Sequence, residues 1–204
     1  MLNDALLLDS ARPVSTVNTF NGCPEHSSEG VHWYVLRVTY SRELKIKAIL
    51  DERGVRAFVP MMWRPSSPTR SGISRQLVPA VSNLCFVRWT KSGIDRFIQE
   101  FGDKSPLYYY WDRTAGRPMT VPEKSMEDFI KVSSSMDEDL IYLTEISQKL
   151  REGQVVKVRS GSFAGIEGRI VRIRKSRRLM VELPGMLAVA STYLRPEDVE
   201  VVNS

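Results

Sequence analysis

The chain has 204 residues, of which 42% are hydrophobic and 26% are charged, and its net charge at pH 7 is +5. This length allows one large domain or two small ones, and the composition excludes a wholly disordered chain. Residues 31–132 and 151–204 are basic, whereas residues 133–150 are acidic. Basic blocks favour contact with nucleic acid, although a solvated surface of mixed charge explains them equally well.

Several classes of protein are not expected from this sequence. The two cysteines, Cys23 and Cys85, predict no disulfide framework, and with the two histidines they lack the spacing of a metal site, so no metal and no cofactor is expected. No apolar stretch has the length of a membrane span, and Leu6–Leu8 is too short for the core of a signal sequence, which predicts a cytoplasmic protein without membrane contact. No catalytic triad, Cys/His pair or phosphate-binding glycine loop is visible, so we expect no enzyme.

The first elements in chain order form an α+β pattern. Residues 1–30 lack periodicity and are expected to be a flexible leader. Trp33–Val38 predicts a strand, and Glu43–Arg53 predicts a helix with Ser41 as its N-cap. The later expected elements are strands at 55–59, 75–78, 84–89 and 107–111 and helices at 93–101 and 123–131. Hairpins with few parallel crossovers favour a mainly antiparallel sheet flanked by helices over 31–132.

The C-terminal part has a different pattern. The polar and charged residues in 133–152 predict a linker, and 153–204 holds about five short strands separated by turn signals such as Gly161 and Gly168. Short strands of this number favour a small closed all-β barrel of the SH3-like type. Their two-residue period and their valines and glycines disfavour a helical alternative, so we expect a stable barrel.

The glycine-punctuated run VVKVRSGSFAGIEGRIVRI at 155–173 is the clearest motif. It resembles the KOW motif, which NusG-type transcription factors share with several ribosomal proteins, with Ser162 in the place of the usual proline. Phe163 on its loop is the expected exposed contact. The basic residues that follow are expected to contact RNA, an acidic ribosomal protein or a termination factor, or simply to keep an edge strand soluble: Arg172, Arg174, Lys175, Arg177 and Arg178.

The first block resembles the NusG N-terminal domain. The residues that carry this resemblance are Trp33-Tyr34-Val35-Leu36, Gly54-Val55, Phe58-Val59-Pro60 and Phe86-Val87. Arg117-Pro118-Met119 is closer to specialised paralogues, the RfaH-like and UpxY-like antiterminators of surface-polysaccharide operons. Ser82-Asn83-Leu84 departs from the family's usual Pro-Gly-Tyr or Pro-Asn-Tyr at the start of a strand, because it lacks the tyrosine.

The resemblance implies a monomeric elongation factor that binds RNA polymerase and promotes antitermination, with a capsular polysaccharide operon as the inferred target. Its apolar depression would bind the paired clamp helices of the largest polymerase subunit through Phe58, Val81, Leu84, Phe86, Tyr108, Tyr109 and Tyr110. At least one of the aromatic side chains at 108–111 is expected on a surface, because neighbouring strand residues face opposite sides.

Two further contacts follow from the same resemblance. Asp95 and Arg96 would meet the gate loop of the polymerase, and a patch beside the first helix would face the non-template DNA strand through Arg42, Lys45, Arg53 and Arg56. Phosphate contacts carry no sequence specificity, and a solvated helix face explains this patch equally well. The alternatives are a ribosome- or RNA-binding KOW protein, whose first domain is only a scaffold, and housekeeping NusG.

Overall fold

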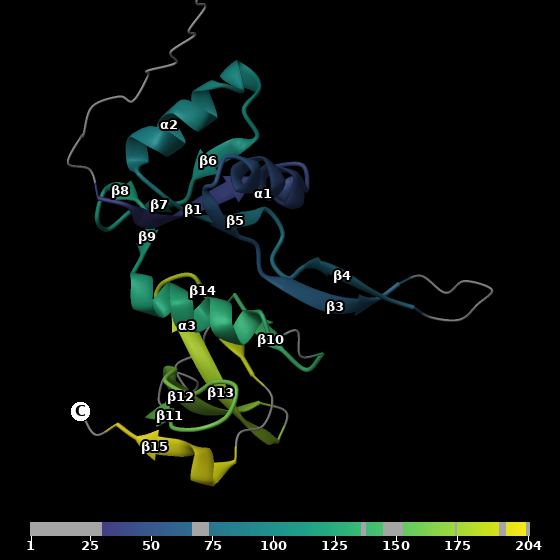
Figure 1. The fold of residues 1–204 in the computed structure, drawn as a ribbon, viewed down its shortest axis with the longest axis vertical. Coiled ribbons are helices and arrows are strands. Elements are labelled where there is room, and N and C mark those ends of the chain that lie inside the picture. The colour runs from purple at the N-terminus through teal and green to yellow at the C-terminus, as the bar shows by residue number, and fades with distance from the viewer. Residues whose placement is uncertain are drawn as a thin grey trace, which may run out of the picture.

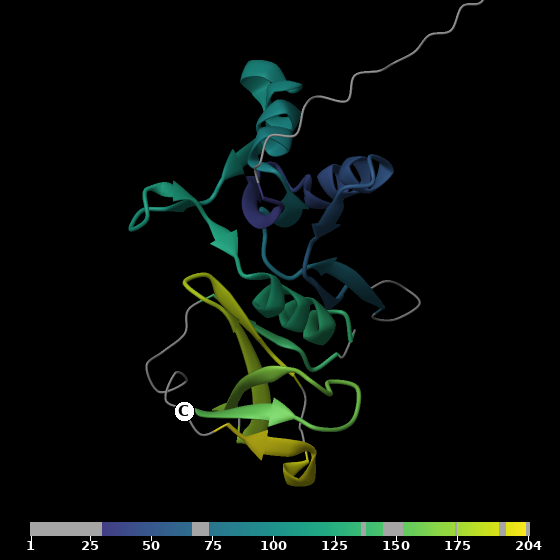
Figure 2. The same cartoon turned by 60° about the vertical axis from the view of Figure 1, so that its left-hand side comes forward.

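The computed structural model describes residues 30–66, 74–135, 138–144, 153–173, 175–191 and 195–202. An N-terminal sheet and a C-terminal sheet lie on opposite sides of one helix, α3 (Glu123–Ser133), in both views of Figures 1 and 2. Every strand pairing among these residues is antiparallel. The mixed α and β composition with antiparallel sheets confirms that part of the predicted fold class.

The N-terminal sheet has the strand order β2-β5-β1-β6, and β9 also pairs with β1. Its strands are β1 (His32–Val38), β2 (Arg56–Phe58), β5 (Leu84–Trp89), β6 (Leu107–Tyr109) and β9 (Thr120–Val121). The helices α1 (Glu43–Glu52) and α2 (Lys91–Gln99) cover one face, where Leu36 packs with Leu50 and Phe97. The other face packs against α3, because alternate strand residues point to opposite sides.

Shorter elements complete the N-terminal half. Two separate hairpin ribbons extend from the sheet, β3 (Met61–Pro65) with β4 (Arg75–Pro79), and β7 (Trp111–Asp112) with β8 (Arg117–Pro118). A 3-10 helix spans Gly102–Lys104. The predicted mobile loop of the first ribbon falls on residues 67–73, outside the described residues.

The C-terminal sheet has six strands in the order β10-β14-β13-β12-β11-β15. Their bounds are β10 (Ile141–Leu143), β11 (Gln154–Val158), β12 (Glu167–Ile173), β13 (Ser176–Leu183), β14 (Leu187–Ala190) and β15 (Val199–Val201), with a 3-10 helix at Pro196–Asp198. The strands over 153–203 agree with the predicted two-residue period, whereas closure into an SH3-like barrel stays a prediction. The structure also places β10 within the range 133–152 that we expected to be a linker.

Helix starts differ from the sequence expectation in two places. Arg42, not Ser41, occupies the N-cap of α1, and Ser41 before it is left-handed with φ 51°. The Arg42 side chain makes no capping bond, because a guanidinium group has no acceptor for a backbone N–H. The second helix begins at Lys91 rather than at 93, because the Thr90 hydroxyl oxygen accepts a hydrogen bond from the Gly93 N–H at 3.1 Å. Such a capping bond contributes about 1 kcal/mol.

Candidate binding surfaces and their cover

One face of the N-terminal sheet carries most of the residues expected to bind the polymerase. Leu84 and Phe86 on β5 and Phe58 on β2 point to the face that α3 covers, together with Val81 and Tyr110. Leu84 and Phe86 are fully buried, and the other three are partly buried. The structure therefore brings five of the seven predicted contact residues together, but beneath other parts of the chain.

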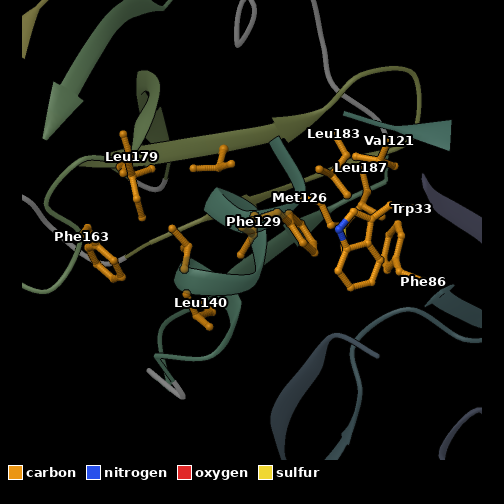
Figure 3. Packing of buried hydrophobic residues seen from close by; sticks show 14 of the residues in the cluster. Trp33, Phe86, Val121, Met126, Phe129, Leu140, Phe163, Leu179, Leu183 and Leu187 are labelled. Carbon is orange, nitrogen blue, oxygen red and sulfur yellow. The ribbon is translucent and has the colours of Figure 1, made fainter. Parts of the chain in front are cut away.

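The ring of Phe129 joins this face to the C-terminal sheet. Its centroid lies 6.2 Å from that of Phe58, 6.0 Å from that of Phe86 and 6.4 Å from that of Tyr142 on β10. Figure 3 shows Phe129 and Met126 on α3, with Trp33 and Phe86 nearby. The buried residues of both sheets consequently form one continuous hydrophobic core that passes through α3.

Polar contacts attach the loop of the KOW motif to α3. The Lys131 amine donates to the Ala164 carbonyl at 2.7 Å, and the Lys124 amine lies 3.3 Å from the Gly165 carbonyl oxygen. The Asp128 carboxylate accepts from the Lys124 amine at 2.7 Å and from the Glu167 N–H at 3.4 Å. A basic pair and one carboxylate on a single helix thus hold the backbone of this loop.

The expectation that Phe163 is exposed is wrong. Only 8% of its surface is accessible, and it packs in the shared core with Leu179 of β13. Gly161 and Gly165 have φ values of 80° and 87°, which favour glycine, and between them the chain turns the phenylalanine inward. An aromatic residue between turn glycines can thus pack into the core as readily as it can contact a partner.

The three consecutive tyrosines separate as strand alternation predicts. Tyr108 is 54% exposed, Tyr110 faces α3, and Tyr109 faces α2. The Tyr109 hydroxyl donates to Asp95 at 2.8 Å, and Asp95 also pairs with Lys91 at 2.5 Å. Of the two residues expected at the gate loop, Asp95 is therefore engaged within the domain.

Two of the four residues expected to contact DNA are paired with carboxylates. Arg53 forms two hydrogen bonds with Glu100, at 2.8 and 2.7 Å, and this bonding raises the pKa of Arg53 and lowers that of Glu100. Arg56 binds Glu127 of α3 at 2.5 Å and lies over the Trp33 ring at 5.2 Å. These two guanidinium groups stabilise packing between elements, which leaves less charge for a phosphate.

The other two basic residues stand beside an unusual loop. Arg42 lies over the Tyr40 ring at 5.4 Å, and Lys45 is exposed on α1. Tyr40 is 80% exposed. Its φ is 63° and that of Ser41 is 51°, so both residues are left-handed. Left-handed conformations are uncommon for residues other than glycine and often occur at functional sites. Tyr40 could not be identified from the sequence, because backbone conformation leaves no signal in composition or spacing.

Glu43 was also missed as a positioning residue. It is buried at the start of α1, and its carboxylate accepts a hydrogen bond from the backbone N–H of Asn83, which has φ 62°. Asn83 lies in the turn that departs from the family's usual Pro-Gly-Tyr or Pro-Asn-Tyr. A buried carboxylate bonded to this amide fixes the turn next to the loop that carries Tyr40.

The hairpin formed by β12 and β13 carries basic residues, some of which make contacts within the chain while others are exposed. Arg178 donates to the carbonyl oxygens of Asp139 and Ser191 at 2.8 and 2.9 Å, so it ties β13 to its neighbours. Arg172 and Arg177 are exposed and directly opposite each other in the ladder, a repulsive arrangement that an anion would relieve. Lys175 is exposed as well, whereas Arg174 lies outside the described residues.

Neither a metal site nor a membrane-spanning helix is found among the residues that the structure describes. No group of three or more His, Cys, Asp or Glu side chains there could hold a metal ion. None of the helices that the structure describes combines the length and the apolar composition needed to cross a bilayer.

Comparison with known proteins gives a family for the N-terminal half. Residues 31–130 match the family described as "Transcription termination factor nusG". These residues thus form a NusG family domain, and the proteins of that family are transcription factors rather than enzymes. No curated protein matches the chain. A solved structure titled "Domain interaction in Thermotoga maritima NusG" is similar over 85% of this chain and 98% of that chain, with 18% sequence identity and a TM-score of 0.44.

Proposed function

We propose that this protein is a transcription elongation factor that binds RNA polymerase through the N-terminal sheet and promotes antitermination. The observation that carries the proposal is the NusG family domain over residues 31–130. The face with Phe58, Leu84 and Phe86 supports it, because an apolar face with aromatic anchors suits a pair of partner helices.

The polymerase would first meet the open edge of this face. Tyr108 is exposed there, opposite Arg37 in the ladder between β1 and β6, and both residues point to the side of the sheet that carries Tyr110 and Val35. Phe58 and Val81 lie deeper, next to α3 and β10. Closer contact at Phe58 and Val81 therefore requires β10 and the C-terminal sheet to move away, while Leu84 and Phe86 stay beneath α3.

Because of this requirement, polymerase affinity depends on the equilibrium between two arrangements. In the closed one the C-terminal sheet packs on the N-terminal half, and in the open one it has moved away. A partner that binds only the open arrangement loses affinity in proportion to the fraction of closed protein. Substitutions that weaken the contacts between α3 and the loop of the KOW motif should then strengthen polymerase binding. Lys131→Ala is suited to this, because it removes the 2.7 Å contact to Ala164 and Lys131 lies outside the expected polymerase surface.

The test is capture of purified elongating RNA polymerase, and of its isolated clamp-helix fragment, by the full-length protein. We expect Tyr108→Ala to weaken capture about thirty-fold, as for an aromatic hot spot, and Lys131→Ala to strengthen it. Leu44→Ala is the matched control, since Leu44 is an exposed apolar residue on α1. No capture of either target by wild type or Lys131→Ala, together with binding to ribosomal RNA, would favour a ribosome-associated KOW protein instead.

The specialised role is a finer part of the same proposal. The resemblance of Arg117-Pro118-Met119 to antiterminators of surface-polysaccharide operons supports a restricted set of targets. Chromatin immunoprecipitation of the tagged protein should find it with polymerase at a few operons, capsular ones among them. Occupancy across all transcribed genes would instead indicate a housekeeping role.

A further inference from the structure

A groove of the N-terminal domain lies between α2 and β6, the strand at one edge of the sheet. Figure 1 shows α2 and β6 at the end of this domain that is far from the C-terminal sheet. The groove has a volume of about 330 Å³, and its lining residues are Asp95, Ile98, Gln99, Leu107, Tyr108 and Tyr109. Because four of these side chains are aliphatic or aromatic and Tyr108 is 54% exposed, the groove presents an apolar surface to solvent.

The polar groups of the groove suit a peptide that binds through its side chains. The Asp95 carboxylate is already engaged by the Tyr109 hydroxyl at 2.8 Å and by Lys91 at 2.5 Å. The Leu107 N–H donates to the Ser105 hydroxyl at 3.2 Å, so it is not available to an added strand. Gln99 is exposed and its side chain forms no hydrogen bond with a described residue, which leaves an amide that can donate to and accept from a peptide backbone.

The N-terminal segment of the chain is attached close to this groove. The ring centroids of His32 and Tyr34 lie 6.3 Å apart, and those of Tyr34 and Tyr109 lie 5.9 Å apart. At Gly30 an added Cβ would lie 2.8 Å from a nitrogen of the His32 ring, so the chain enters β1 beside this row of rings. Residues 1–29, which lie outside the described residues, are therefore joined to the domain two ring contacts away from the groove.

This segment has the opposite charge to the domain that follows it. Residues 1–30 contain one basic and four acidic side chains, a net charge of −3, whereas residues 31–132 contain seventeen basic and ten acidic side chains, a net charge of +7. The longest apolar run in the segment is Ala5–Leu8, and it has Asp4 and Asp9 at its two ends. An apolar run between two carboxylates matches an apolar groove on a basic domain.

Two exposed cations lie near the groove. Arg37 is opposite Tyr108 in the ladder between β1 and β6, and Lys104 lies in the connection from α2 to β6. Neither forms an ion pair with a described residue. Carboxylates on both sides of an apolar run would therefore find positive charge beside the groove.

We propose that the run Ala5–Leu8 docks in the groove between α2 and β6 of the same chain. The 21 residues between Leu8 and Gly30 can span about 70 Å when extended, so the run reaches the groove without strain. A tether of this kind holds the run at an effective concentration on the order of millimolar. A contact too weak to form between separate molecules is therefore populated within one chain, which favours this occupant over a second copy.

The docked run would cover Tyr108 at the mouth of the groove. Tyr108 is also the residue that we expect the polymerase to meet first, so the run and the polymerase would compete for it. This consequence rests on the proposed function, whereas the docking itself does not.

Paramagnetic relaxation enhancement in the full-length protein tests the docking. Ala5→Cys/Cys23→Ser places a single reactive thiol beside the run, because Cys85 is buried and its pKa is raised to about 12. With a nitroxide label on that thiol, we expect the amide NMR signals of Gln99 and Leu107 to lose most of their intensity relative to the sample with the reduced label. Amide signals of the C-terminal sheet should keep theirs.

Two triple substitutions in the labelled protein compare the run with the rest of the segment. Each one introduces three aspartates: Leu6→Asp/Leu7→Asp/Leu8→Asp and Val14→Asp/Val17→Asp/Phe20→Asp. The first should restore the two amide signals, because a carboxylate is not transferred into an apolar groove. The second is the matched control, since it adds the same charge outside the run, and it should leave the loss of intensity unchanged.

On the groove itself, Tyr108→Ala should reduce the loss of intensity more than Leu44→Ala, which removes an exposed apolar side chain from α1. A mixture of spin-labelled protein with isotope-labelled protein that carries no nitroxide distinguishes one chain from two copies, and we expect no broadening in the mixture.

The proposal is overturned if the signals of Gln99 and Leu107 keep their intensity in the labelled chain or if the first triple substitution leaves them broadened. Equal effects of Tyr108→Ala and Leu44→Ala, or broadening of the same signals in the mixture, would also overturn it, since the run would then bind elsewhere or on a second copy. Because the assay contains no polymerase, failure of polymerase capture and failure of docking are read independently.

Discussion

Replacement of Phe129 by alanine should separate the two halves of the molecule. Phe129 is fully buried, and its ring contacts Phe58 and Phe86 on the N-terminal sheet and Tyr142 on β10 of the C-terminal sheet. Its removal leaves a cavity at the point where the shared core passes through α3. The expected loss in the free energy of unfolding is about 4 kcal/mol, within the range for buried phenylalanines. At this chain length that lowers the melting temperature by about 8–16 °C.

Two probes can follow the halves separately. All four tryptophans of the chain lie at positions 33 to 111, so tryptophan emission arises from the N-terminal half. The amide NMR signals of Val181 and Val189, which are buried in the C-terminal sheet, report the other half. In urea titrations of the wild type the two probes should show coincident transitions, because one core joins the sheets. In Phe129→Ala the transitions should separate.

Phe97→Ala is the control for a general loss of stability. Phe97 is equally buried, but it packs with Phe101 and Trp89 on the opposite face of the sheet, away from α3. This variant should unfold at lower urea with both probes still coincident. Coincident transitions in Phe129→Ala, or a loss below about 1 kcal/mol where 3–5 kcal/mol is usual, would refute the reasoning that this ring couples the halves.

Three substitutions and one labelling experiment test local features. Gly161→Ala should cost about 1–2 kcal/mol because its φ is 80° in open space, whereas Gly168→Ala should cost more in thermal melts, because an added Cβ would lie 2.6 Å from a backbone carbonyl oxygen. Burial raises the pKa of the Cys85 thiol to about 12, so at pH 8 mass spectrometry should find this cysteine labelled by a thiol reagent only after denaturation; rapid labelling of the native protein would contradict this burial. Arg53→Ala should cost less than about 1 kcal/mol at pH 7. Because Arg53 lowers the pKa of Glu100, the stability contributed by this pair is present above the ordinary glutamate pKa and disappears as the pH falls through the lower folded value, so wild type and variant should converge at pH values below the folded pKa of Glu100 and differ at pH 7.

Local patterns in the sequence predicted most of the secondary structure. The apolar run at 84–89 gave the bounds of β5 correctly, and Gly54 ends α1 with a φ of 70°. These features depend on neighbours within a few residues. Strand β10 was not predicted, because Ile141–Leu143 has only three residues and pairs with β14, more than forty positions later.

The candidate sites were harder to predict for the same reason. Arg53 and Arg56 looked like free cations, but their carboxylate partners lie 47 and 71 residues away in the chain. Phe163 was expected on the surface because the helix that its loop contacts, α3, lies in the N-terminal half of the chain. Spacing along a single sequence contains no information about such distant partners, whereas the alternation of Tyr108 and Tyr109 was predictable from the strand itself.

The contacts that cover the apolar face also determine which interactions must break before a partner can reach it. Helix α3 covers this face, and the C-terminal segment packs on α3 through the loop of the KOW motif and β10 while its strands are formed. Release therefore requires loss of the contacts to α3 and to the N-terminal sheet, such as the hydrogen bond from the Tyr142 hydroxyl to the Met61 carbonyl at 3.1 Å. It does not require loss of any strand pairing among β11 to β14. Circular dichroism of Lys131→Ala should then match wild type even where polymerase binding is stronger, whereas a gain of helix signal in the opened variant would show that release involves refolding.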